Sequence, residues 1–211
     1  MKTYKTIEEE VQQANIFIDN YEKNEDVRIK LDVYGFGTEA ILTGKTLLAE
    51  VNSKNQHQKA EVGQKCNATI NCNMQFDKAN NKIKVIYRIT KLALPEKGLF
   101  LQLGLENLAY TSFSSWAQNG IDFYTNALKN PTIMERLLKY KIKEADLQEG
   151  KRLIEVAINA HHEQVKETGD ARIATEERND ALSELRKWYS EAKTIAKLAL
   201  DKREYEKLGV K

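Results

Sequence analysis

The fold is decided by a long run without proline, residues 144–200, which reads EADLQEGKRLIEVAINAHHEQVKETGDARIATEERNDALSELRKWYSEAKTIAKLAL. Every third and fourth residue of this run forms a coiled-coil stripe that is apolar at both ends and polar in the middle. The stripe consists of Ile154, Ala157, His161, Gln164, Thr168, Ala171, Thr175, Arg178, Leu182, Leu185, Tyr189, Ala192, Ala196 and Ala199. Residues 38–94 show the same spacing and also lack proline. Because proline and turn residues normally end helices, both runs are predicted to be long helices.

The two runs belong to an internal repeat. When the chain is shifted by 106 residues, residues 4–94 fall on residues 110–200 without a gap, and 22 of the 91 aligned positions are identical. A repeat of this kind indicates a tandem duplication of one supersecondary unit. We therefore expect a first helical repeat over residues 1–105 and a second over residues 106–211, intertwined in one pseudo-symmetric unit.

Two shorter helices are expected before each long one. In the first repeat, Thr6 followed by Glu9 forms a capping-box pattern at the start of a helix over residues 7–24. A short helix is then expected over residues 26–34. The second repeat predicts the same pair, with a first helix that starts near residues 111–112 and a short helix over residues 132–140.

Each first helix is expected to end at a repeated Lys-Asn pair. Asparagine tolerates the left-handed backbone conformation that often ends helices, so Asn24 and Asn130 are the predicted caps. Pro131 follows in the second repeat, where it can open the next helix because the first turn leaves its amide positions unpaired.

The glycines Gly63 and Gly169 leave two architectures open. If they lie inside continuous helices, the chain is all-α, with long antiparallel helices whose ends are bundled with the short ones. If they are turns, each repeat forms its own small four-helix bundle. The heptad phase runs through both glycines, and a glycine inside a helix costs only about 1 kcal/mol, so continuous helices are favoured.

Composition narrows the classes of function. The net charge is +2, and neither repeat has the basic stripe that nucleic-acid binders carry, so no nucleic-acid partner is expected. No apolar stretch reaches the 18 or so residues needed to span a bilayer, so no membrane association is expected. Cys66 and Cys72 lie six residues apart on one predicted helix and point to different faces, so both are expected to be buried free thiols. These features favour a soluble protein of the cytoplasm.

The polar middle of the long helices holds all three histidines of the chain, His57, His161 and His162. On a helix, Glu61 lies one turn from the first of them, and Glu163 lies one turn from Glu167, so a metal site can be drawn there. The Glu-x-x-His pairs of di-iron bundles are absent, however, and so is a His-Glu-x-x-His motif. We expect solvated or core-polar histidines and predict no metal-ligating residue.

Other chemical motifs are also missing. The repeated Gly44-Lys45 and Gly150-Lys151 pairs lack the upstream glycine of a phosphate loop, so we interpret the glycines as places where a neighbouring helix comes close. No serine or cysteine lies in a nucleophile motif. The sequence predicts no catalytic residue, no cofactor-binding residue and no cofactor. Trp116 and Trp188 are expected in or at the edge of the core.

One apolar stretch, residues 99–105, lies outside the predicted helices. We interpret it as a strap that packs over the end of a bundle, because an isolated strand would be unstable without a partner. Its apolar character is also the sole ground for a weaker hypothesis, reversible insertion into a membrane.

The leading functional hypothesis is a non-enzymatic helical scaffold or protein-interaction module with an unknown protein partner. The alternative is a ligand- or metal-binding helical bundle that uses the polar middle of the long helices, with its histidines and glutamates. The sequence specifies neither the oligomeric state nor the partner.

Overall fold

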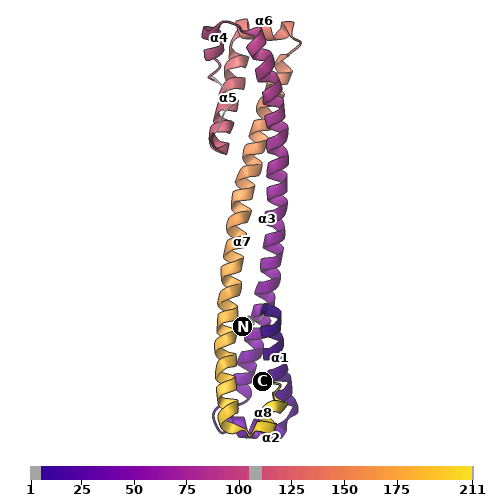
Figure 1. Cartoon of the computed structure of the whole chain (residues 1–211), viewed down its shortest axis with the longest axis vertical. Coiled ribbons are helices and arrows are strands. Elements are labelled where there is room, and N and C mark those ends of the chain that lie inside the picture. The colour runs from indigo at the N-terminus through magenta and orange to yellow at the C-terminus, as the bar shows by residue number, and fades with distance from the viewer. Residues whose placement is uncertain (1–5, 105–110, 211) are drawn as a thin grey trace, which may run out of the picture. The chain divides into compact units, whose positions relative to one another are not determined.

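The computed structural model describes residues 6–104 and 111–210 (Figure 1). The regular secondary structure of these residues is entirely helical. The helices are α1 (Ile7–Lys23), α2 (Glu25–Asp32), α3 (Thr38–Ala93), α4 (Lys97–Leu101), α5 (Phe113–Lys129), α6 (Pro131–Lys139), α7 (Glu144–Ala199) and α8 (Lys202–Lys207). The predicted all-α class is confirmed, and each expected helix is present within two residues of its predicted bounds.

The two long helices, α3 and α7, are each 56 residues long and pack antiparallel, as predicted. The order of their contacts shows the direction. The indole Nε1 of Trp188 donates a hydrogen bond to the carbonyl oxygen of Ala40 at 2.8 Å, and Lys54 Nζ lies 2.8 Å from Glu177 Oε2. Contact positions therefore rise along α3 as they fall along α7.

Gly63 and Gly169 lie inside α3 and α7, so the alternative of two consecutive four-helix bundles is wrong. A β-carbon at either glycine would have no atom within 4 Å. Neither glycine is needed for a turn or for a close approach, and the helix passes through both because one glycine costs it too little to end it.

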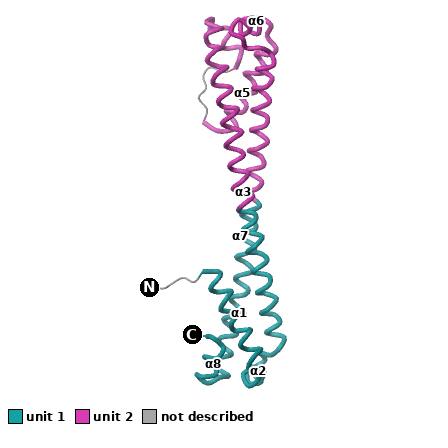
Figure 2. Tube along the Cα trace, turned by 90° about the vertical axis from the view of Figure 1, so that its right-hand side faces the viewer, with its two compact units in different colours: residues 1–62, 170–211 teal, residues 63–169 magenta. Residues whose placement is uncertain are grey.

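The chain divides into two compact units (Figure 2). Unit 1 contains residues 1–62 and 170–211, and unit 2 contains residues 63–169. Unit 1 packs α1, α2 and α8 against the first part of α3 and the last part of α7, while unit 2 packs α4, α5 and α6 against the remaining parts. Each unit thus takes helices from both predicted repeats.

Each unit has its own apolar core. The core of unit 1 is centred on the buried side chains Phe17, Leu31, Val51, Leu185 and Ala192. The core of unit 2 is centred on the buried side chains Phe123, Ile133, Leu137, Leu147 and Ile154. Burying such side chains is the main favourable contribution to folding, at roughly 25 cal/mol per Å² of apolar surface removed from water.

The predicted caps are confirmed at the helix starts but not at the helix ends. Thr6 and Glu9 form the expected capping box of α1, and Ser112 and Ser115 form one for α5. Pro131 opens α6, as predicted. The expectation of left-handed caps is wrong, because both cap asparagines are extended, with φ near −116° and −108°. An extended residue fits here because the next helix starts at the following residue. Asn130 is also the N-cap of that helix, and its side chain accepts a hydrogen bond from the amide of Ile133.

The apolar stretch after α3 packs on unit 2. Its first part is the short helix α4, in which the ring of Phe100 lies 5.5 Å from that of Tyr87, and the following Leu103 is fully buried. The last residue of the predicted strap, Leu105, lies outside the described residues. None of the described helices is both long and apolar enough to cross a bilayer.

Candidate functional site

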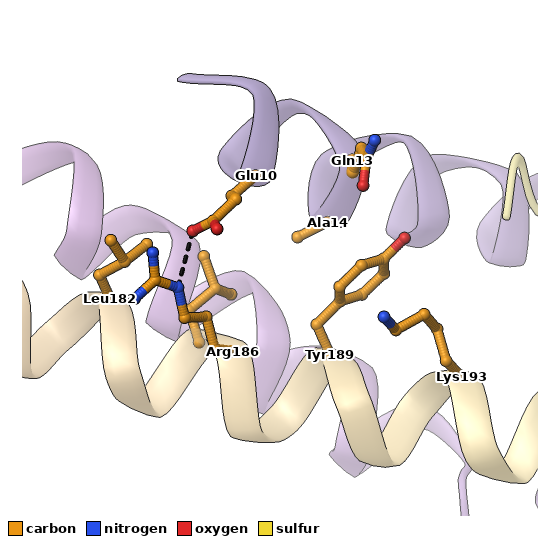
Figure 3. Close-up of a pocket in the computed structure, with 8 residues that line it drawn as sticks. Glu10, Gln13, Ala14, Leu182, Arg186, Tyr189 and Lys193 are labelled. Carbon is orange, nitrogen blue, oxygen red and sulfur yellow. Dashed lines mark hydrogen bonds and ion pairs between the residues drawn. The ribbon is translucent and has the colours of Figure 1, made fainter. Parts of the chain in front are cut away.

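A cleft lies between α1 and the last part of α7 in unit 1 (Figure 3). Its volume is about 190 Å³. Its lining consists of Glu10, Gln13, Ala14, Leu182, Leu185, Arg186, Tyr189 and Lys193. Both contributing helices belong to unit 1, so the cleft is a feature of one compact body.

The floor of the cleft is apolar. Leu182 and Leu185 are buried and belong to the stripe that the sequence places on the core side of α7. From α1, Ala14 is also buried, and its small side chain leaves room above the leucines. In Figure 3 the ring of Tyr189 reaches from α7 towards α1 and closes one side of the cleft.

The rim of the cleft is charged. At one side, Arg186 Nε donates to Glu10 Oε2 at 2.7 Å and joins α7 to α1. At the other, Lys193 Nζ lies 4.7 Å from the centre of the Tyr189 ring, a cation–π arrangement. Burial raises the pKa of the Tyr189 hydroxyl, with a smaller effect from Tyr205, so this hydroxyl is neutral at physiological pH.

This arrangement suits binding more directly than catalysis. Among the described residues, the only ring or carboxylate that contacts Lys193 is the Tyr189 ring, so its ammonium group can take an anionic partner. The apolar floor can receive a flat hydrophobic group beside it. The sequence analysis did not single out this cleft. A signal was nevertheless present, because the alignment at an offset of 106 residues pairs the charged Glu10 with the large apolar Trp116.

The histidines lie apart from this cleft. His57 is exposed, and its Nε2 lies 3.7 Å from Glu61 Oε1. The ring of His161 stacks on Phe113, with ring centres 4.2 Å apart, and His162 is exposed.

A second cavity, of about 390 Å³, lies in unit 2 beside the start of α5. His161 lines it together with Cys72 and Gln164. Cys72 is a buried free thiol whose pKa is raised by burial, whereas Cys66 is exposed. The expectation that both thiols are buried is therefore wrong for Cys66, because its position on α3 faces away from the packed helices.

The repeated glycines allow aromatic rings to pack closely. A β-carbon at Gly44 would overlap the ring of Trp188, and one at Gly150 would overlap the ring of Tyr124. The interpretation of these glycines as places of close approach is confirmed. Both tryptophans are buried, as expected, with Trp116 2% and Trp188 7% exposed.

The comparisons with known proteins add no relative. No protein-family model, curated protein or solved structure matches this chain.

Proposed function

We propose that this protein is a non-enzymatic helical scaffold or protein-interaction module that docks a partner through the cleft between α1 and α7. The observation that carries the proposal is the combination of a buried apolar floor, Leu182 and Leu185, with a charged rim that contains Lys193. An apolar centre with a polar rim is the usual anatomy of a protein interface.

The size of the cleft supports a protein partner. Pockets for drug-sized ligands usually measure roughly 300–1,000 Å³. The cleft, at about 190 Å³, holds much less. It suits one anchoring side chain of a partner, and such anchors carry most of the binding energy in protein interfaces.

The test is affinity capture from the native source with the full chain as bait, compared with a Leu182→Lys variant. Placing a charged side chain on the floor removes the apolar surface that an anchor needs. We expect a partner that the wild-type chain captures and the variant loses. The absence of any captured partner, together with a purified small molecule bound at one equivalent, would contradict the proposal.

We also propose that the chain is a tandem duplication with repeats 1–105 and 106–211. The bounds of the main helices support this: α5 starts and ends 106 residues after α1, and α7 starts and ends 106 residues after α3. The turns before the long helices also correspond, because Gly35 and Lys141 both adopt a left-handed φ, 75° and 65°.

A fragment of residues 1–105 tests the intertwined arrangement. Because each unit takes helices from both repeats, one repeat alone lacks the partner helix of either unit. We expect the fragment to self-associate or remain unfolded in sedimentation and circular-dichroism experiments. A fragment that folds as a stable monomer would contradict the arrangement.

A cytoplasmic location and the absence of nucleic-acid partners remain part of the proposal. The free thiols Cys66 and Cys72 and the net charge of +2 support them. Fractionation of the source cells, and a filter-binding assay with DNA and RNA at physiological salt, test these two statements.

A second candidate function is a ligand- or metal-binding helical bundle. The observation that favours it is the cavity in unit 2, where His161 and Cys72 line the same space. Imidazole and thiolate are both ligands for zinc. Metal analysis of the purified protein tests the metal-binding form of this function. Stoichiometric zinc that is lost in His161→Ala would support it, and a metal-free protein that binds no added zinc would exclude zinc binding in this cavity.

A further inference from the structure

The residues that line the cleft of unit 1 can be compared with the aligned residues of unit 2. Shifted by 106 residues, α1 corresponds to α5, and the last part of α7 corresponds to the last part of α3. The comparison rests on the proposed interaction function and on the proposed duplication, and it identifies what kind of partner the cleft takes.

In unit 2 the place that corresponds to the cleft holds an indole ring. Trp116 aligns with Glu10, and Phe76 aligns with Leu182. Trp116 is 2% exposed, and its ring centre lies 4.7 Å from that of Phe76. In unit 2 a buried tryptophan therefore packs against Phe76 at this position, whereas unit 1 has a glutamate in the aligned position and a cleft beside it.

The volume of the cleft agrees with an aromatic occupant. A cavity of about 150 Å³ in another protein binds one benzene molecule. The cleft measures about 190 Å³, so one larger aromatic side chain fits and a drug-sized molecule does not. Its floor of Leu182 and Leu185 offers an apolar surface for the face of such a ring.

The rim charges indicate what flanks the aromatic group. Arg186 and Lys193 of the cleft align with the uncharged Asn80 and Tyr87 in unit 2. In unit 1, Glu10 neutralises one of them, and Lys193 contacts only the Tyr189 ring among the described residues. A partner with carboxylates next to its aromatic residue would complement the remaining positive charge.

We propose that the cleft between α1 and α7 binds a tryptophan side chain from an acidic segment of a partner protein, in the place that Trp116 occupies in unit 2. The indole ring lies on Leu182 and Leu185, and a neighbouring carboxylate pairs with Lys193.

The probe is a five-residue acidic peptide, acetylated and amidated, with tryptophan at its centre and two glutamates on each side. Its binding to the full chain is measured by calorimetry, with a peptide that has alanine at the centre as the reference. We expect the tryptophan peptide to bind at least tenfold more tightly than the alanine peptide. Equal or undetectable binding of both peptides overturns the proposal.

Two variants locate the binding site. Glu10→Trp places an indole on α1 as in unit 2, so it should fill the cleft and abolish peptide binding. Glu8→Trp is the matched control, because it makes the same change on an exposed position of α1 outside the cleft. Circular dichroism is the check that both variants fold. If Glu10→Trp binds the peptide as tightly as Glu8→Trp does, the cleft is not the site.

A third variant tests the charge. Lys193→Gln should weaken the binding of the acidic peptide severalfold. It should not change the binding of a peptide in which glutamines replace the glutamates. If Lys193→Gln changes the binding of both peptides equally, the inference that the partner segment is acidic is wrong.

A further experiment distinguishes failure of the tryptophan inference from failure of the proposed interaction function. Affinity capture with Glu10→Trp as bait shows whether a partner still binds when the cleft is filled. A partner retained by this variant, with no peptide binding by the wild-type chain, means that the chain is an interaction module whose partner binds outside the cleft, so both the docking through the cleft and the tryptophan inference are wrong. No partner for either bait means that the interaction function itself fails.

Discussion

The ring of Trp188 lies against Gly44, at a place where a β-carbon on residue 44 would overlap it. The indole nitrogen donates a hydrogen bond to the carbonyl oxygen of Ala40 one turn earlier at 2.8 Å. Trp188 therefore packs on α3 in the space that Gly44 leaves, and its hydrogen bond to Ala40 fixes it there. This contact joins the start of α3 to the last part of α7 and helps to form the interface on which α1 packs.

Gly44→Ala should destabilise unit 1, because the added methyl group must displace the Trp188 ring. Overpacking of this kind costs about 1–3 kcal/mol. Gly63→Ala is the matched control: it lies in the same helix with open space around it, so it should stabilise the helix by about 0.5–1 kcal/mol. Urea denaturation followed by circular dichroism measures both. A stable Gly44→Ala variant would show that the ring has room to move.

Lys141→Gly should stabilise the turn between α6 and α7. Lys141 has a φ of 65°, a left-handed conformation that costs a residue with a β-carbon roughly 1–2 kcal/mol. The residue 106 positions earlier, Gly35, is already a glycine at a φ of 75°. We expect a rise in the unfolding midpoint for Lys141→Gly and a fall for Gly35→Ala. A fall in the unfolding midpoint for Lys141→Gly as well would show that the left-handed backbone of Lys141 does not destabilise its turn.

Trp116→Ala should open a cavity in unit 2 and cost about 3–5 kcal/mol, as large-to-small changes of buried aromatic residues do. Trp116 is 2% exposed, and its ring packs against those of Phe76 and Phe113, with ring centres 4.7 and 5.3 Å away. Added indole should bind in the cavity, restore part of the stability and shift the NMR signals of Phe76. In the wild-type chain these signals should not move, because Trp116 fills the space.

The contact between α2 and α8 should depend on pH in the acidic range. The hydrogen bond from Lys30 lowers the pKa of the Glu204 carboxyl, and the backbone amide of Glu204 lowers the pKa of Asp201. A lowered pKa in the folded state means that the stabilisation is complete above the ordinary carboxyl range, about pH 4, and is lost as pH falls through the lowered values.

NMR of the Lys30 ammonium group during an acid titration measures the loss of its contact with the Glu204 carboxylate. Glu204→Gln is the control, because it keeps the size of the side chain and removes its titration. Loss of the contact near neutral pH would contradict the assignment of this pH dependence to Glu204. The same pH dependence in Glu204→Gln would also contradict it.

The two thiols should react at different rates. Cys66 is exposed, whereas Cys72 is buried and burial raises its pKa, so its reactive thiolate is rare. We expect a thiol reagent at pH 8 to modify one equivalent quickly in the folded protein and the second only after unfolding. Cys66→Ser should remove the fast phase; a fast phase that remains would mean that Cys72 becomes accessible in the native state.

The sequence by itself determined the helices. Absence of proline over residues 38–94 and 144–200, an unbroken heptad phase and capping residues such as Thr6 are local properties, and local hydrogen bonds within the chain are enough to express them. The expectation of long antiparallel helices, which followed once Gly63 and Gly169 were placed inside continuous helices, is also confirmed.

The tertiary structure alone decided where the cleft lies. Glu10 and Arg186 are 176 residues apart, and only the packing of α1 on α7 puts them within hydrogen-bond distance. The alignment of Glu10 with Trp116 was visible in the sequence, but its meaning depended on whether Trp116 is buried against Phe76 or points to solvent. Side-chain packing between helices is a long-range property, and no periodicity along one helix specifies which gap is filled and which stays open.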